Sequence, residues 1–189
     1  MRYLVVSDTH GNRKDLRDAI GRYGPFDGLI HLGDGVLDGQ AIADEMGIPF
    51  HGIHGNEDYG SNYPDMEVMD LDGRSYLLLH GFQLDMNPYH PPSVWRETLA
   101  ELAKMARKRK ARGVFFGHTH QALLDMAGDT LILNPGDQYR GASIPPSFAV
   151  IETVNGETRI ALYRKGGPDR WRIISEAYLK EKAPEPFYP

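Results

Sequence analysis

The sequence contains no cysteine among its 189 residues, which excludes disulfide bonds, thiolate metal ligands and a cysteine nucleophile. Any metal site must therefore be built from His, Asp, Glu or Asn side chains. The sequence also lacks a run of about 18 apolar residues, so we expect no membrane-spanning helix. The formal net charge of −5 argues against a dedicated nucleic-acid-binding protein.

The first residues, MRYLVVSDTHGN, lack the features of a signal peptide. Their apolar run is short, and Asp8 follows it without a small-residue cleavage site, so we expect a cytoplasmic protein. We predict a single domain over residues 1–180, because 189 residues fit one domain. Residues 181–189 are rich in proline, and we expect them to form a C-terminal tail. The sequence leaves the oligomeric state open, a homo-oligomer included.

Short apolar runs alternate with helical segments in the first third of the chain. We expect strands at residues 2–8, 28–34 and 48–54, with helices at 12–20 and 37–46 between them. This β-α-β-α-β order predicts parallel strands joined by right-handed crossovers.

The remainder of the chain is predicted to form hairpins and one further helix. The expected hairpin turns are Asp72-Gly73, Gly128-Asp129 and Asn155-Gly156. The helix is predicted over residues 93–112, and a strand-like run follows it at 113–120. We therefore predict a mixed α/β protein with helices outside two sheets that pack face to face.

Side chains of the kinds that bind metals follow five of the predicted strands. They are Asp8, His10, Asp34, Asn56, His80, His118 and His120. Loops at the carboxyl ends of parallel strands converge, so we expect these side chains to share one region. Oxygen and imidazole donors suit divalent ions such as Mn, Fe, Co, Ni and Zn. With one bridging carboxylate, seven donors supply four ligands to each ion of a two-metal centre.

Each motif taken alone has an ordinary structural explanation. Asp8 has the character of a turn or helix-cap residue, and His80 that of a hydrogen-bonded surface histidine. Their joint occurrence at strand ends favours a metal centre. Glycines adjoin the proposed ligands at Gly33, Gly55, Gly81 and Gly117, where they allow a tight backbone turn or let another loop pack close to the metals.

The motifs Asp8-x-His10, Gly33-Asp34, Gly55-Asn56, His80 and Gly117-His118-x-His120 resemble those of the calcineurin-like metallophosphoesterases. The similarity covers residues 1–165 and is greatest to the small single-domain phosphodiesterases of bacteria and archaea. It implies a four-layer αββα sandwich with a dinuclear metal centre at one edge. The ligand sets that it implies are Asp8, His10, Asp34 and His120 for one ion, and Asp34, Asn56, His80 and His118 for the other. The segment 134–137 resembles one that gives structural support in such enzymes.

The resemblance also implies a function. The expected activity is hydrolysis of small phosphate diesters by attack of a metal-activated hydroxide. The implied cofactors are two divalent ions, with Mn the first choice and Fe, Ni, Co, Zn or Mg as alternatives. The family also includes a retromer subunit that uses this fold as a protein-interaction scaffold. A weakly active or non-catalytic scaffold is therefore the alternative to an enzyme.

One position departs from the family pattern. Many members carry His after Gly-Asn and use it as the proton donor, whereas this chain reads Gly55-Asn56-Glu57-Asp58. Asn56 is expected to bind both metal and phosphate, but a Glu57 carboxyl beside two cations stays ionised and is a poor acid. Other candidate acids are His51, His54 and His90. We therefore expect a preference for esters with good leaving groups.

Overall fold

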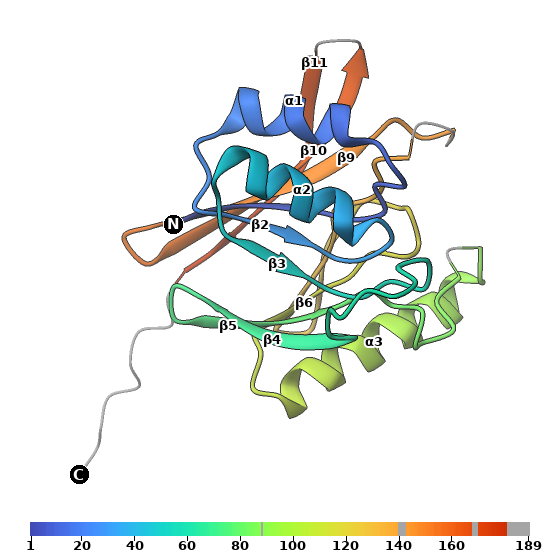
Figure 1. Cartoon of the computed structure of the whole chain (residues 1–189). Helices are drawn as coiled ribbons and strands as arrows, with labels where there is room; N and C mark the ends of the chain where they lie inside the picture. Colours follow the sequence, from blue (N-terminus) through green and yellow to red (C-terminus); the bar gives the residue numbers. More distant parts are fainter. Residues whose placement is uncertain (88, 140–142, 168–169, 181–189) are drawn as a thin grey trace.

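The computed structural model describes residues 1–87, 89–139, 143–167 and 170–180. Two mixed sheets pack face to face at its centre, and three helices cover their outer faces (Figure 1). The layers therefore run helix, sheet, sheet, helix, which confirms the αββα sandwich expected from the sequence. The expected tail at 181–189 lies outside the described residues.

The first sheet has six strands in the order β11-β10-β9-β1-β2-β3. They are β1 (Arg2–Val6), β2 (Gly28–His31), β3 (Phe50–Gly52), β9 (Ser147–Val154), β10 (Glu157–Gly167) and β11 (Arg170–Leu179). Strands β1, β2 and β3 are parallel neighbours, as the β-α-β-α-β order predicts. Their connections are α1 (Arg13–Tyr23) and α2 (Val36–Met46), which lie on the outer face of this sheet (Figure 1).

The second sheet has five strands in the order β4-β5-β6-β8-β7. They are β4 (Met66–Leu71), β5 (Arg74–Leu79), β6 (Gly113–Phe115), β7 (Leu123–Ala127) and β8 (Thr130–Asn134). Helix α3 (Pro92–Lys108) covers its outer face (Figure 1). The helix stops four residues before the expected end at 112, because Lys110 has a φ of +58°, a left-handed conformation that an α-helix does not accommodate.

Alternation along the strands divides the core into layers. On β5 and β6, Leu78 and Phe115 face the other sheet, whereas Leu77, Leu79 and Val114 face α3. All five side chains have no exposed surface. This period of two is what a strand covered on both sides requires, and it makes the space between the sheets the largest apolar layer.

Strand β11 is the main element that the sequence analysis missed. It pairs antiparallel with β10 at the edge of the first sheet. Most of its side chains are partly or fully exposed, so its hydrophobic alternation is weak. Trp171 is the exception, since it is buried and packs edge-on against Phe148 at a centroid distance of 4.7 Å.

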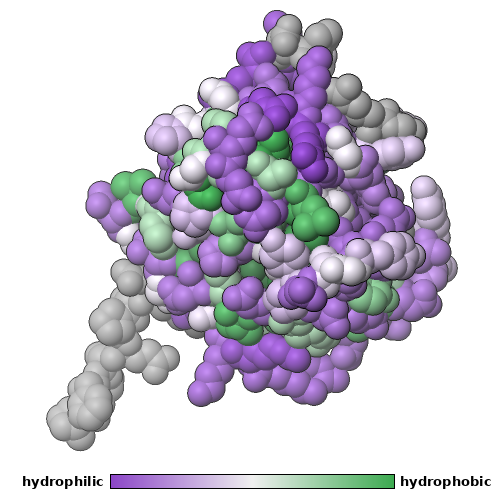
Figure 2. Space-filling view, viewed as in Figure 1, coloured by the Kyte–Doolittle hydropathy of each residue, from purple (hydrophilic) through white to green (hydrophobic). Residues whose placement is uncertain are grey.

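No helix in the described ranges has the length and apolar character needed to cross a membrane. On the face of the molecule drawn in Figure 2, hydrophilic residues cover most of the surface and hydrophobic ones form small patches. The large apolar side chains are mostly inside the three core layers.

The inter-sheet layer is the part of the core whose loss we expect to cost most stability. Leu78→Ala removes a fully buried side chain and should lower the free energy of unfolding by about 2–5 kcal/mol. Val154→Ala, at a side chain that is 59% exposed, is the control and should change it by less than about 0.5 kcal/mol. Urea unfolding followed by circular dichroism measures both. Equal losses in the two variants would contradict the layer assignment.

Candidate metal centre

The proposed ligands lie in loops at the carboxyl ends of five strands. The loops are those that follow β1 (Asp8, His10), β2 (Asp34), β3 (Asn56), β5 (His80) and β6 (His118, His120). Backbone hydrogen bonds join these loops directly: Asp8 N donates to Gly33 O at 2.9 Å, and Gly117 N donates to His80 O at 2.9 Å. Both sheets therefore contribute to one edge of the sandwich.

The acidic and imidazole side chains form three overlapping groups whose donor atoms lie within 4.8 Å of one another. The groups are Asp8–His10–His120, Asp8–Asp34–His80 and His10–Asp34–Glu57. Asp8 Oδ1 lies 3.2 Å from His120 Nε2 and 4.0 Å from the Nε2 atoms of both His10 and His80. His80 Nε2 is also 3.3 Å from Asp34 Oδ2. The buried carboxylate of Asp8 is thus the centre of the site.

Of the other residues singled out from the sequence, His118 and His54 lie outside these groups, which comprise acidic and imidazole side chains only. The half-buried His118 ring is 5.2 Å from the His80 ring, and its backbone N–H donates to Asp8 Oδ2 at 3.1 Å. Asn56 is exposed in the loop after β3. His54 is half-buried, and its Nδ1 forms a 2.8 Å hydrogen bond with Ser61 Oγ.

The backbone at the site adopts conformations that most residues avoid. Eight non-glycine residues in the described ranges have a positive φ, and five of them are proposed ligands. These are Asp8 (+52°), His10 (+42°), Asp34 (+55°), His118 (+63°) and His120 (+57°). Such residues cost about 1–3 kcal/mol each and persist where the surrounding structure fixes them, often at functional sites.

Two glycines permit the close approach of the loops. A Cβ on Gly33 would lie 2.6 Å from His80 Nδ1 and 2.8 Å from the Gly55 Cα. A Cβ on Gly117 would lie 2.8 Å from Asp8 Oδ2. All three distances are shorter than side chains tolerate, so the packing around Asp8 and His80 requires glycine at these positions.

Three of the imidazoles share one orientation. In each, Nε2 faces an aspartate of the cluster and Nδ1 contacts an oxygen on the opposite side of the ring; for His10 that oxygen belongs to Glu57, a member of the third group. The Nδ1 partners are Leu32 O for His80 (2.6 Å), Asp137 Oδ2 for His120 (3.0 Å) and Glu57 Oε2 for His10 (3.2 Å). Metal-binding histidines commonly have this arrangement, because the Nδ1 partner fixes the tautomer in which Nε2 carries the free lone pair.

The electrostatics of the site show an excess of negative charge. Asp8 and Asp34 are buried, with 0% and 3% of their surfaces exposed. Ion pairs with Asp137 and Asp8 raise the pKa of His120 to about 10. Burial lowers the pKa of His80, but the ion pair with Asp34 and the charge of Asp8 outweigh it and raise that pKa above its usual value. The protons on the His80 and His120 rings therefore lie at positions where the surrounding carboxylates favour positive charge.

The donor atoms fit a divalent cation. Ten buried side-chain nitrogen and oxygen atoms of the described residues form no aligned hydrogen bond, and three of them, Asp8 Oδ1, His10 Nε2 and His80 Nε2, belong to the site. Buried polar atoms without partners are rare, and these three converge on one point. A mixed set of carboxylate and imidazole donors is a set that borderline divalent ions bind well.

The segment after β8 supports the loop between His118 and His120. The Asn134 side-chain amide donates to Gly117 O at 2.8 Å and to Thr119 Oγ1 at 3.0 Å. Asn134 Oδ1 accepts from Gly136 N at 2.8 Å, and Asp137 contacts His120 as described above. Through these contacts, the segment Asn134-Pro135-Gly136-Asp137 holds the loop that carries His118 and His120 in place.

Asp58 is a supporting residue that the sequence analysis did not single out. Its buried carboxylate accepts four backbone N–H groups, those of Asp34 (2.8 Å), Gly35 (2.7 Å), Val36 (2.9 Å) and Gly55 (2.9 Å). These bonds join the loop after β2 to the loop after β3. The sequence feature that could have indicated its role is its position in the segment Gly55-Asn56-Glu57-Asp58, directly after Glu57.

The sequence analysis also missed His31, which is hydrogen-bonded to the loops that follow β1 and β2. The Gly33 N–H donates to His31 Nδ1 at 3.2 Å, so the ring proton is on Nε2 and points to Thr9 Oγ1 at 3.1 Å. The Thr9 hydroxyl lies 3.1 Å from Asp38 Oδ2, to which it donates. Complete burial of His31 lowers its pKa to about 4, which keeps the ring neutral in this network.

Two surface depressions adjoin His10. One, of about 260 Å³, is lined by His10, Arg13, Lys14 and Tyr139, among others. The other, of about 400 Å³, is lined by His10, Leu37, Glu57 and Tyr59, among others. His10 therefore lies at the mouth of the site, between a basic depression and an acidic one.

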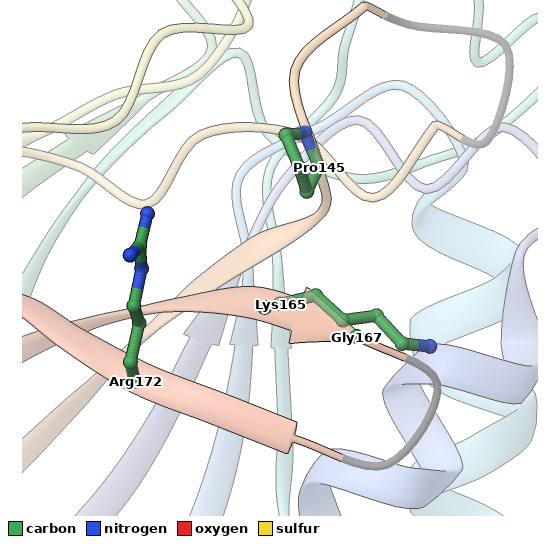
Figure 3. A pocket seen from close by; sticks show the side chains of 5 residues that line it. Pro145, Lys165, Gly167 and Arg172 are labelled. Atoms are coloured by element: carbon green, nitrogen blue, oxygen red, sulfur yellow. The ribbon is translucent and has the colours of Figure 1, made fainter.

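A further cavity of about 470 Å³ lies at β10 and β11 and contains none of the proposed ligands (Figure 3). Its lining includes Pro145, Lys165 and Arg172. Lys165 reaches toward α1 (Figure 3), where it forms an ion pair with Asp15. This cavity lacks the clustered donors of the edge site.

Comparison with known proteins agrees with this geometry. Residues 1–156 match the family model of the calcineurin-like phosphoesterase superfamily domain. The probable metallophosphoesterase YsnB of Bacillus subtilis is 26% identical over 169 residues, which cover 88% of this chain and 93% of that protein.

Solved structures share the fold. A point mutant of Vps29 from Entamoeba histolytica superposes with a TM-score of 0.74 at 22% identity, covering 95% of this chain and 100% of that one. An archaeal phosphodiesterase superposes with a TM-score of 0.61 at 22% identity, covering 86% of this chain and 99% of that one.

The His31 network predicts a pH dependence of stability. The pKa of His31 is about 4 in the folded chain and 6.5 as its ordinary value, so between these pH values the unfolded chain binds a proton that the folded chain does not. The contribution of His31 to the free energy of unfolding is complete above pH 6.5. As the pH falls to 4, that free energy decreases by on the order of 3 kcal/mol. Denaturant unfolding across this range should show a shallower dependence for His31→Gln. An unchanged slope in the variant would contradict the prediction.

The four bonds to Asp58 predict a large effect on both stability and metal binding. Asp58→Ala should lower the free energy of unfolding by about 3–5 kcal/mol, because it leaves several inward-facing N–H groups without an acceptor. It should also weaken Mn²⁺ binding, measured by calorimetry, since Asp34 loses its support. The matched control is Asp70→Ala, whose side chain accepts one N–H, from Gly73, in an exposed turn. A similar small loss in both variants would refute the bracing role.

Proposed function

Because this chain belongs to the calcineurin-like phosphoesterase superfamily, we propose that it is a metal-dependent phosphodiesterase that hydrolyses small phosphate diesters. The observation that carries the proposal is the convergence of Asp8, His10 and His80 atoms that are buried without aligned hydrogen bonds. When bound, a pair of divalent cations supplies an activated water near neutral pH and offsets the charge of the phosphate.

The ligand assignment remains part of the proposal. Asp8, His10, Asp34 and His120 are assigned to one ion, and Asp34, Asn56, His80 and His118 to the other. The grouping of Asp8 with His10 and His120 supports the first set, and the group that joins Asp34 and His80, which also contains Asp8, supports the second. The proximity of the His118 ring to His80 supports the second set. Manganese is the first choice of metal, with Fe, Ni, Co, Zn or Mg as alternatives, since oxygen and nitrogen donors can bind all of these ions.

The two depressions beside His10 support a diester as the substrate class, since one can accept each ester arm. Arg13 and Lys14 line the first and attract an anionic arm. Arg13 is held in place by Asp38, whose Oδ1 accepts from its Nε at 2.7 Å. Leu37 and Tyr59 in the second depression suit an apolar or aromatic arm.

Proton donation to the leaving group is the weakest part of this site. Asn56 is proposed to contact the phosphate, and neither Glu57 nor His54 has the features of an efficient acid. Glu57 contacts His10, and His54 is hydrogen-bonded to Ser61. Substrates with good leaving groups, such as aryl diesters, should therefore react fastest.

The principal alternative is a protein-interaction scaffold. One of the similar structures is Vps29 bound to a cyclic peptide, and its identity of 17% shows the fold alone. The clustered donors favour an enzyme, because a scaffold does not require them. Turnover decides between the two functions.

The direct test is hydrolysis of bis(4-nitrophenyl) phosphate with added Mn²⁺. We expect metal-dependent release of nitrophenolate. His80→Ala should lower the rate of hydrolysis at least about 100-fold, because it removes a metal ligand. The control Tyr178→Ala, at a residue 59% exposed on β11, should retain full activity. Absence of turnover with Mn, Fe, Co, Ni, Zn and Mg alike would support the scaffold.

A further inference from the structure

We propose that Glu57 is a positioning residue that holds His10 in the tautomer required for metal binding. This inference rests on the proposed metal-dependent function, and it gives a role to the residue that replaces the usual proton donor. Glu57 Oε2 lies 3.2 Å from His10 Nδ1. His10 Nε2, on the other side of the ring, is buried and faces Asp8 Oδ1 at 4.0 Å.

The position of Glu57 is fixed by its backbone. The Glu57 N–H donates to Asp34 Oδ1 at 2.8 Å, so the residue is tied to one of the proposed ligands. The neighbouring Asp58 joins the same loop to the loop after β2, as described above. Although the Glu57 side chain is 58% exposed, the hydrogen bond to Asp34 holds its backbone in place.

The other two oriented imidazoles show why His10 needs such a partner. His80 and His120 have Nδ1 acceptors that are themselves buried, the Leu32 carbonyl and the Asp137 carboxylate. His10 has Glu57 in the equivalent place. Without it, the favourable location for the single proton of a neutral ring is Nε2, where it faces the negative charge of Asp8. That tautomer leaves no lone pair for a metal.

The same geometry separates this role from two others. A general acid must carry a proton to the leaving group, whereas the Glu57 carboxylate lies 3.2 Å from His10 Nδ1 and, in this proposal, accepts the proton of that nitrogen. Glu57 also belongs with His10 and Asp34 to one of the three donor groups, but its carboxylate contacts His10 Nδ1, the nitrogen opposite the Nε2 that faces Asp8, and the second test below separates the two roles. The depression beside Glu57 is open to solvent, and His10 is therefore the imidazole whose support can be changed with least disturbance to the core.

The first test is the tautomer of His10 in the full-length chain without metal. Long-range ¹H–¹⁵N NMR at a pH where imidazole is neutral should show the proton on Nδ1 in the wild type. It should move predominantly to Nε2 in Glu57→Ala and remain on Nδ1 in Glu57→Gln, whose amide oxygen still accepts. The matched control is Glu97→Ala on α3, which should leave the His10 signals unchanged. An Nδ1 proton in Glu57→Ala would overturn the proposal.

The second test is Mn²⁺ binding by calorimetry, with thermal unfolding to verify the fold of each variant. Glu57→Ala should weaken the affinity of one site about 10-fold, the lower end for loss of such a partner, and Glu57→Gln should restore most of it. Equal losses in both variants, with an unchanged His10 tautomer, would make Glu57 a ligand and overturn the positioning role. Neither measurement uses turnover, so a tautomer shift in a protein inactive on all diesters would overturn only the proposed function.

Discussion

The constraint on which the site depends is the placement of two carboxylates, Asp8 and Asp34, in the interior and within 4.8 Å of each other. Two like charges at this distance in a poorly solvated environment repel strongly. Positive charge must therefore be supplied locally. The raised pKa values of His80 and His120 show that protons meet part of this need. Divalent cations can meet it more fully and release those protons when they bind.

Such a cluster forms only because the fold holds its loops against that repulsion. The parallel strands β1 and β2 bring Asp8 and Asp34 to one edge, and buried apolar layers fix those strands. Asp58 then joins two of the loops through its backbone bonds. Left-handed conformations at the ligands are the local cost of directing several side chains inward, and the rest of the sandwich compensates for it.

The sequence was informative where residue types that bind metals stood next to glycines at the ends of apolar runs. Short apolar runs ending in Gly-Asp or Gly-His located the strand ends, and hence the edge at which Asp34 and His118 lie. It was uninformative where a role depends on contacts distant in sequence. His31 looked like an ordinary strand residue because its partner Thr9 is 22 residues away. Strand β11 was missed because an exposed edge strand needs little hydrophobic alternation.

The Nδ1 partners of the three oriented imidazoles also differ in exposure, and this bears on the side from which a substrate would approach under the proposed function. The acceptors of His80 and His120 are buried, whereas that of His10 is exposed. Both depressions meet at His10. For the phosphodiesterase that we propose, a buried partner on this side would close the opening through which the phosphate enters. An exposed carboxylate orients the ring and leaves the entrance open, so its long flexible side chain is suited to that one position.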